Sequence, residues 1–190
     1  MTRRVAFRPA LRALVGALPL LWAACAAPIV PQRSRPGGSA RWAETLALPK
    51  AVIWAPDAVL CSIQGAGVGS DGWLPDHGGV WRLYYWSANQ PSMFEVSVDS
   101  EGSVHTLDVK NLSQRGSRLP SGWIDSPKVW SVTHSHQKSE AVHTLDAELA
   151  LNAEPEKYAT RTVWRIRFWM PNNATESHVV TPEAVWLSSY

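Results

Sequence analysis

A glycine-rich run has a spacing that is known from nucleotide chemistry. Residues 67–72 read Gly-Val-Gly-Ser-Asp-Gly, the G-x-G-x-x-G pattern of dinucleotide-binding loops. Such a loop needs a strand before it and a helix immediately after it. Trp73-Leu74-Pro75 follows here and is a poor start for that helix. The sequence therefore predicts a flexible loop between two strands rather than a nucleotide site.

Histidines are the next side chains that could do chemistry. His134 and His136 lie two residues apart, and His143 follows them. Residues two apart on a helix point away from each other, and no carboxylate or cysteine stands at ligand spacing from the pair. We expect a solvated helix end here and no metal.

Nucleophilic and acid–base motifs are missing from the sequence. Ser126-Pro127-Lys128 lacks the S-x-x-K spacing, and G-x-S-x-G does not occur. Asp71, Asp76 and Glu95 form no recognisable acid–base pair. We therefore expect a protein without catalytic residues or cofactor, and not an enzyme.

A repeated strand carries the most specific pattern. VWRLYYW at residues 80–86 returns 83 residues later as VWRIRFW at 163–169. Successive strand side chains point to opposite faces. One face of each copy is apolar, which predicts core residues: Trp81, Leu83 and Tyr85 in the first copy, and Trp164, Ile166 and Phe168 in the second.

The opposite face of the repeated strand is a candidate binding surface. It carries arginine beside aromatic side chains, a combination that interaction surfaces over-use. The alternative is that these side chains only cover the outer face of a sheet. We expect Glu95 near the first arginine and no acid near the second-copy arginines, which would be the freer cations. The candidate binding residues are Arg82, Tyr84, Trp86, Arg165, Arg167 and Trp169.

The elements around each copy predict an α+β fold. A first helix is expected over about 40–55 with Ser39 as N-cap, and Pro49 is expected to kink or split it. A second helix is expected from Asp125, with Pro127 in its first turn, to about Gln137. The predicted strands are 58–64, 80–87, 93–99 and 103–109, then 144–152, 161–170, 177–181 and 184–188. We interpret the order as two helix-β-β-β repeats, an antiparallel sheet with helices packed on one face.

Several segments resemble bacterial PepSY-like domains over about residues 45–190. The segments that carry the resemblance are Trp54–Ile63, the Asp71-Gly72 loop, the two core triplets, Trp123–Pro127 and Val96–Val104. The last of these resembles the closing hairpin of the family through its D-x-x-G-x-V pattern, from Asp99 to Val104. Thr181 and Ala184 replace its aspartate and glycine in the second copy, so a tight glycine turn is not expected there. The resemblance implies compact α+β units, a cell-envelope location and inhibitor-like binding, and it supplies no catalytic residues.

Residues 1–25 have the pattern of a secretory signal. Four arginines precede a short apolar run from Leu14 to Ala24, too short for a transmembrane helix. The end resembles a lipoprotein signal, with Trp22 where leucine is usual, and it implies lipid on Cys25. In many Gram-negative bacteria an aspartate after the lipidated cysteine retains a lipoprotein in the inner membrane. Ala26 stands at that position here, so the resemblance implies the outer membrane, facing the periplasm or the cell surface. The alternative is ordinary cleavage near Cys25, which would give a secreted or periplasmic soluble protein.

The remaining sequence divides into a tether and two repeats. We expect a Pro/Gly-rich tether at 26–40, a first PepSY-like repeat at 41–110, a linker at 111–122 and a second repeat at 123–190. The chain has 18 basic and 16 acidic residues. Without the four signal arginines, 14 bases stand against 16 acids, a net charge of −2, which gives no electrostatic case for nucleic-acid binding.

The two cysteines have mutually exclusive fates. If Cys25 is lipidated, Cys61 is a lone thiol buried within a strand. If Cys25 is not lipidated, a Cys25–Cys61 disulfide becomes possible in an oxidising compartment.

These observations predict a non-enzymatic envelope lipoprotein that binds an envelope protein or an extended peptide. The membrane would be reached through the N-terminal lipid. The alternatives are a structural envelope protein without a specific ligand, and a tryptophan-based carbohydrate or lipid binder.

Overall fold

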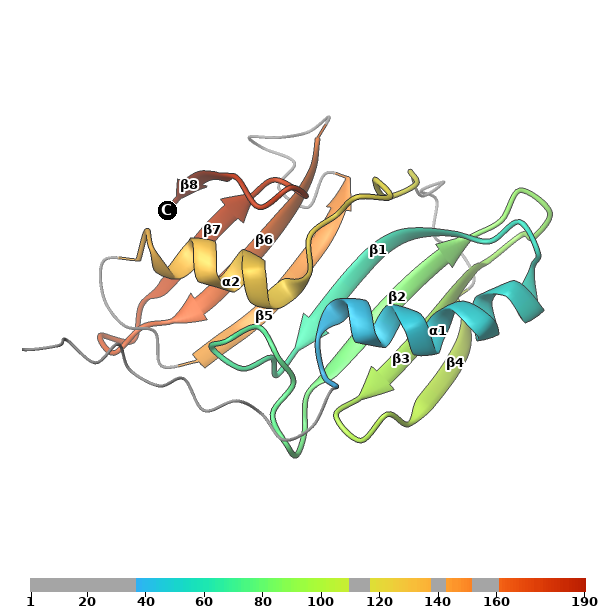
Figure 1. Cartoon of the computed structure of the whole chain (residues 1–190), viewed down its shortest axis with the longest axis horizontal. Coiled ribbons are helices and arrows are strands. Elements are labelled where there is room, and N and C mark those ends of the chain that lie inside the picture. The colour runs from blue at the N-terminus through green and yellow to red at the C-terminus, as the bar shows by residue number, and fades with distance from the viewer. Residues whose placement is uncertain (1–36, 110–116, 138–142, 152–160) are drawn as a thin grey trace, which may run out of the picture. The chain divides into compact units, whose positions relative to one another are not determined.

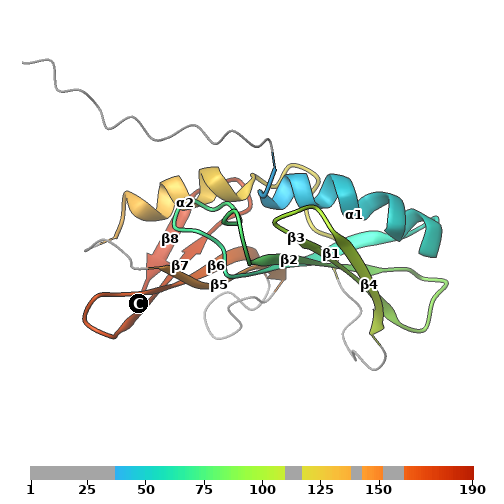
Figure 2. The same ribbon diagram turned by 90° about the horizontal axis from the view of Figure 1, so that it is seen from below.

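Two helices and eight antiparallel strands make up the described part of the chain (Figure 1). The computed structural model describes residues 37–109, 117–137, 143–151 and 161–190. The strands form one sheet in the order β4-β3-β2-β1-β5-β6-β7-β8. Both helices lie on the same face of this sheet (Figure 2). The predicted α+β class, antiparallel sheet and one-sided helix layer are confirmed.

Each helix is followed by four strands, in agreement with the eight predicted strands but not with the helix-β-β-β order that we inferred from them. β4 and β8 form the two edges of the sheet, and β1 and β5 pair at its centre. The elements of the first half are α1 (Ala40–Trp54), β1 (Val59–Ala66), β2 (Val80–Trp86), β3 (Met93–Asp99) and β4 (Val104–Val109). Those of the second half are α2 (Ser126–His134), β5 (His143–Leu151), β6 (Thr162–Trp169), β7 (Thr175–Val180) and β8 (Trp186–Ser189).

α1 is one continuous helix, so of the predicted kink or split at Pro49 the split does not occur. Ser39 is its N-cap, and the Ser39 side chain accepts a hydrogen bond from the Trp42 N–H. A ridge of alanines faces the sheet on both sides of the proline and is fully buried: Ala40, Ala43, Ala47 and Ala51. Tertiary packing supplies most of the stability of a helix. The packing of this ridge therefore keeps α1 helical, although Pro49 has no N–H and one helical hydrogen bond is missing.

α2 begins as predicted and ends three residues early, at His134. Asp125 is its N-cap, and Pro127 lies in its first turn. The Asp125 carboxylate also accepts the Arg41 N–H at 2.9 Å, and the Ser126 hydroxyl accepts the Ala40 N–H at 3.0 Å. One carboxylate therefore caps the beginnings of both helices and ties the two halves together.

The six predicted core residues of the repeated strands are all buried, with at most 1% of any of them exposed. The indoles of Trp81 and Trp164 meet edge to face at 6.4 Å between ring centroids, and Trp130 of α2 packs edge-on against both. Trp81 also donates a hydrogen bond from Nε1 to the Gly38 carbonyl at 2.9 Å. The prediction is confirmed, and the core runs without a break between the two halves.

The two outer hairpins have the same turn, against expectation. The Asp99 N–H donates to Ser103 and the Gly102 N–H donates to Asp99, with Gly102 at a φ of 86°. Thr181, Ala184 and Val185 repeat this pattern in the second half, with Ala184 at a φ of 62°. An alanine therefore adopts the left-handed conformation that glycine adopts at lower cost.

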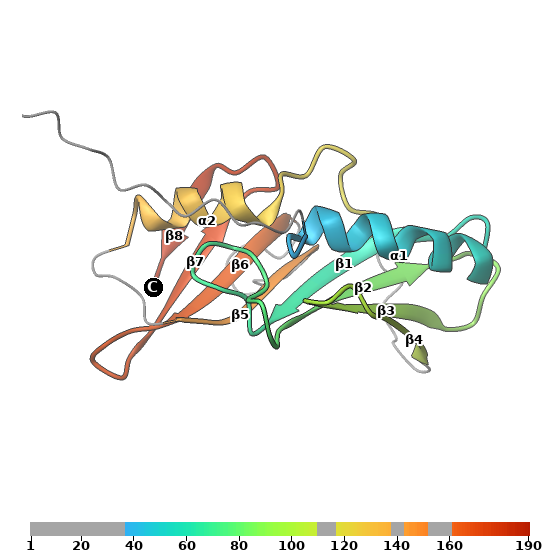
Figure 3. The same ribbon diagram turned by 60° about the horizontal axis from the view of Figure 1, so that its bottom comes forward.

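The G-x-G-x-x-G segment is a loop between β1 and β2, as predicted. It reaches across to the second half beside α2 (Figure 3). There the Gly69 carbonyl accepts a hydrogen bond from the Thr144 hydroxyl at 3.2 Å, and the Ser70 carbonyl contacts the His134 ring. Val68 and Leu74 are buried in the core. The loop is thus anchored at several points.

The predicted boundaries of the tether and linker differ from the structure. Gly38, Ser39 and Ala40 are buried parts of the fold, whereas the predicted tether of residues 26–40 includes them. Leu119 of the predicted linker is buried and donates its N–H to the Leu60 carbonyl at 2.9 Å. The signal, Cys25 and the tether up to residue 36 lie outside the described residues. Within the described part, neither helix is long and apolar enough to cross a membrane.

Candidate functional site

The sheet face opposite the helices carries all six predicted binding residues. Figure 2 shows that neither helix covers this face, which we call the open face. The strand register aligns its polar side chains in rows across the central strands. In one row Gln64 stands between Arg82 and Glu148, and Glu148 stands opposite Arg165.

Glu95 neutralises the first-half arginine, as predicted. The Arg82 Nε lies 3.7 Å from Glu95 Oε1, and the Ser97 hydroxyl donates to the same oxygen at 2.8 Å. Tyr84 stands opposite Glu95 and donates a hydrogen bond to Gln64 Oε1 at 3.3 Å. Burial, with a smaller contribution from the charge of Glu95, raises the pKa of Tyr84 to about 12, so this phenol remains a donor at neutral pH.

The second-half arginines are paired, so the prediction that they are freer cations is wrong. Arg165 donates to Glu148 Oε2 at 3.2 Å and lies 4.0 Å from Asp146 Oδ1. Arg167 donates from Nε to both oxygens of Asp146, at 2.9 and 2.8 Å, and also contacts it through Nη2. The hydrogen bond with Asp146 raises the pKa of Arg167.

The partners of these arginines were not among the residues predicted from the sequence. Asp146 and Glu148 are two residues apart on β5, as Arg165 and Arg167 are on β6. That matching spacing is the signal that could have revealed the pairs. Gln64 was also missed. It donates from Nε2 to Glu148 Oε1 at 3.2 Å and joins the two halves across the β1–β5 pair.

The charged side chains form an ordered network with no net charge. We call it the charged network: Arg82, Glu95, Asp146, Glu148, Arg165 and Arg167. Its side chains are between 15% and 45% exposed. At that exposure each pair contributes about 0.2–1 kcal/mol to stability. The network positions donors and acceptors in the plane of the open face more than it stabilises the fold.

Aromatic and apolar side chains flank the charged network. Trp86 and Trp169 are both partly exposed, and strand alternation places them on the open face. Trp169 stacks on His143 at 6.3 Å between ring centroids. A small apolar cluster of Ala150, Val163 and Val179, with Leu187 packed against it, is also set apart from the main core.

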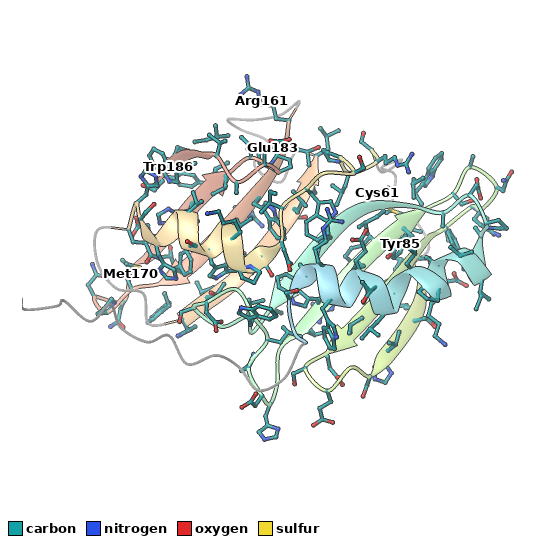
Figure 4. All side chains as sticks on the ribbon, viewed as in Figure 1. Cys61, Tyr85, Arg161, Met170, Glu183 and Trp186 are labelled. Carbon is teal, nitrogen blue, oxygen red and sulfur yellow. The ribbon has the colours of Figure 1, made fainter. Side chains whose placement is uncertain are left out.

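The histidines are dispersed in different surroundings. His134 contacts Gln137 and the Ser70 carbonyl, while His136 stacks on Trp186 at 4.2 Å (Trp186 is labelled in Figure 4). His178 is fully buried in β7, and burial lowers its pKa although Glu176 Oε1 lies 3.1 Å away. In the part of the chain that the structure covers, no three His, Cys, Asp or Glu residues gather as a metal would require.

Cys61 is buried within a strand, as predicted, and no cysteine among the described residues pairs with it. It lies in β1 and its Sγ contacts the Val59 carbonyl at 3.4 Å. Burial raises the pKa of Cys61 to about 11, so it remains an unreactive thiol at neutral pH. Whether Cys25 pairs with it lies outside the described residues.

The chain was also compared with known proteins. No protein-family model matches it, and neither a curated protein nor a solved structure matches it.

Proposed function

We propose that this protein is a non-enzymatic binding module of the cell envelope that holds a protein or an extended peptide on the open face. One observation carries the proposal. Neither helix covers the open face, and it presents a hydrogen-bonded charged network between two partly exposed tryptophans. Arginine and tryptophan are the residues that contribute most at protein interfaces.

The arrangement of the charged network suits a polypeptide partner. Its arginines are held by their acids before any partner arrives, which lowers the entropic cost of ordering long side chains on binding. Planar guanidinium groups can share their donors with backbone carbonyls or carboxylates of a partner. The charged network has no net charge. The arrangement of its positive and negative groups, and not a net electrostatic attraction, would therefore determine which partner binds.

A charge-swap series tests the proposed function. Reversing Arg165 and Arg167 to glutamate should abolish capture of the envelope partner that the wild type captures. Adding Asp146→Arg and Glu148→Arg restores the internal pairs with opposite polarity. Stability should then recover, while capture stays lost because the pattern offered to the partner is inverted. Recovery of capture together with stability would assign the network a purely structural role.

We propose that the two halves are PepSY-like repeats. The proposal is supported by the order of one helix and four strands in each half, and by the mirrored strand order about β1 and β5. It is also supported by the matching turns at Gly102 and Ala184. If the turns are equivalent, Gly102→Ala should destabilise the protein by about 1 kcal/mol or more, and Ala184→Gly should be neutral or stabilising. Unfolding titrations that give the opposite signs would contradict the equivalence.

We propose that lipid on Cys25 attaches the module to the outer membrane. The support is the signal-like sequence before Cys25 and the Pro/Gly-rich segment after it. Cys25→Ser should release a soluble protein, and mass spectrometry of the native protein should find diacylglycerol on its N-terminal cysteine. A Cys25–Cys61 disulfide in protein from the native envelope would contradict lipidation.

A second candidate function is a structural envelope protein without a specific ligand. The observation that favours it is the internal pairing of Arg82, Arg165 and Arg167. The charge-swap series separates the two functions, since a structural role requires only that the pairs be restored.

A further inference from the structure

A pocket on the helix side of the sheet is separate from the open face. Its volume is about 260 Å³, and it lies between α1, the beginning of β1, the end of β2 and the segment 118–123. Most of its wall is apolar, formed by residues such as Leu48, Val59, Leu60 and Leu119. Small-molecule sites also have an apolar wall with a few polar groups. Their volumes begin at about 300 Å³, slightly above the volume of this pocket.

One residue that lines this pocket, Tyr85, carries a buried hydroxyl. Tyr85 is 1% exposed, and its hydroxyl makes no hydrogen bond with any residue that the structure describes. Figure 4 marks Tyr85 in the half of the sheet beneath α1. Buried polar atoms are normally paired, so the Tyr85 hydroxyl is a donor that an acceptor entering from the pocket would satisfy. Burial and the nearby charge of Glu44 raise its pKa, which keeps it a donor.

The charges around the pocket leave one cation without compensation. Arg41 pairs with Glu44 at 2.7 Å, donates to the Ser121 and Trp123 carbonyls and stacks on the Trp123 ring. Arg118 is exposed at the pocket wall and has no ion pair or hydrogen bond within the described ranges. Arg41 and Glu44 cancel, so Arg118 gives the site one net positive charge.

We propose that this pocket binds a carboxylate carried on a small apolar body. The carboxylate accepts hydrogen bonds from Arg118 and from the Tyr85 hydroxyl, and the apolar body packs against Leu48, Leu60 and Leu119. This chemistry belongs both to a free monocarboxylic acid and to the C-terminal residue of a peptide. The pocket does not depend on the open face, so either site can fail in tests without the other.

Titration of the full chain with defined probes, followed by NMR, tests the proposal. The probes are hexanoate for the free acid and N-acetyl-leucine for a peptide C-terminus, with N-acetyl-leucinamide as the neutral control. At least one acid should produce saturable shifts at the amides of Leu60 and Leu119. The amide should bind at least about tenfold more weakly, because it lacks the charge that Arg118 compensates. Tighter binding by one acid identifies the source of the carboxylate.

Neighbouring tyrosines on opposite faces provide the matched control. Tyr85→Phe should weaken acid binding about tenfold while leaving the unliganded protein as stable as the wild type or more so, since it deletes an unpaired buried hydroxyl. Tyr84→Phe, on the open face, should leave acid binding unchanged. Arg118→Gln is an exposed substitution that keeps the fold and should also weaken binding about tenfold.

Three results would overturn the proposal. One is the absence of saturable binding by either acid at about 10 mM. Another is equal binding by the acids and the amide. The third is unchanged affinity in both Arg118→Gln and Tyr85→Phe. A loss of stability in Tyr85→Phe, combined with no binding by either acid, would indicate that the Tyr85 hydroxyl donates its hydrogen bond to a buried water.

Discussion

Gly65→Ala should destabilise the fold, because the side chains of Trp81 and Val68 leave no room for a methyl group at this position of β1. A Cβ there would stand 2.5 Å from Trp81 Cζ3 and 2.6 Å from Val68 Cγ2. Trp81 cannot turn away, since its indole donates to Gly38 and packs against two other tryptophans. Overpacking of this kind costs about 1–3 kcal/mol. Alanine recovers about 0.5–1 kcal/mol of backbone entropy in a strand.

If overpacking costs about 3 kcal/mol, the upper end of its range, and alanine recovers about 1 kcal/mol, the net loss of stability should be about 2 kcal/mol. At about 2–4 °C per kcal/mol, this loss lowers Tm by about 6 °C. Thermal and urea unfolding of Gly65→Ala measure it. Gly122→Ala is the matched control, because no atom lies within 4 Å of the added Cβ and its effect should stay within about 0.5 kcal/mol. Trp81→Phe removes the clashing ring atoms, so adding Gly65→Ala to that variant should cost less. Equal cost in both backgrounds would refute the packing described here.

Three further predictions concern stability. Trp164→Ala should cost about 3–5 kcal/mol in urea unfolding, and a loss below about 1 kcal/mol would contradict its place in the core. The lowered pKa of buried His178 means that the unfolded chain binds a proton first, so stability should fall as pH drops below about 6.5. His178→Gln should flatten that slope, and an unchanged slope would assign it to other groups. Asp146→Asn should lower stability by only about 0.5–1 kcal/mol, because Arg167 is 45% exposed; a loss above about 2 kcal/mol would show a buried role.

The repeated strand predicted more of the fold than any other segment. Its alternation identified the buried and open faces correctly, because the side-chain period of a strand is fixed by the backbone. The beginnings of the helices at Ser39 and Asp125 were also predictable, because N-caps are local signals. The continuity of α1 through Pro49 was not predictable, since it depends on an alanine ridge packed on a distant sheet.

The pairing of the open-face arginines depends on which strands are neighbours and on their register, and neither could be predicted from the sequence. Glu148 reaches Arg165 and Gln64 only because β5 pairs with both β6 and β1 in one register. The pocket likewise required the segment after the first four strands to return to β1, where Leu119 bonds to Leu60. Contacts between distant segments set both features, whereas periodicity and caps are local.

Photo-crosslinking on the two faces tests the proposed binding on the open face most directly. A benzophenone amino acid would replace Trp86 on the open face or, as the control, Ser131 on the exposed side of α2. In envelope preparations, the Trp86 variant should form an adduct with one defined protein or peptide, and the Ser131 variant should not. Excess wild-type protein should compete that adduct away. Adducts from Ser131 alone, or none from Trp86, would contradict a partner on the open face.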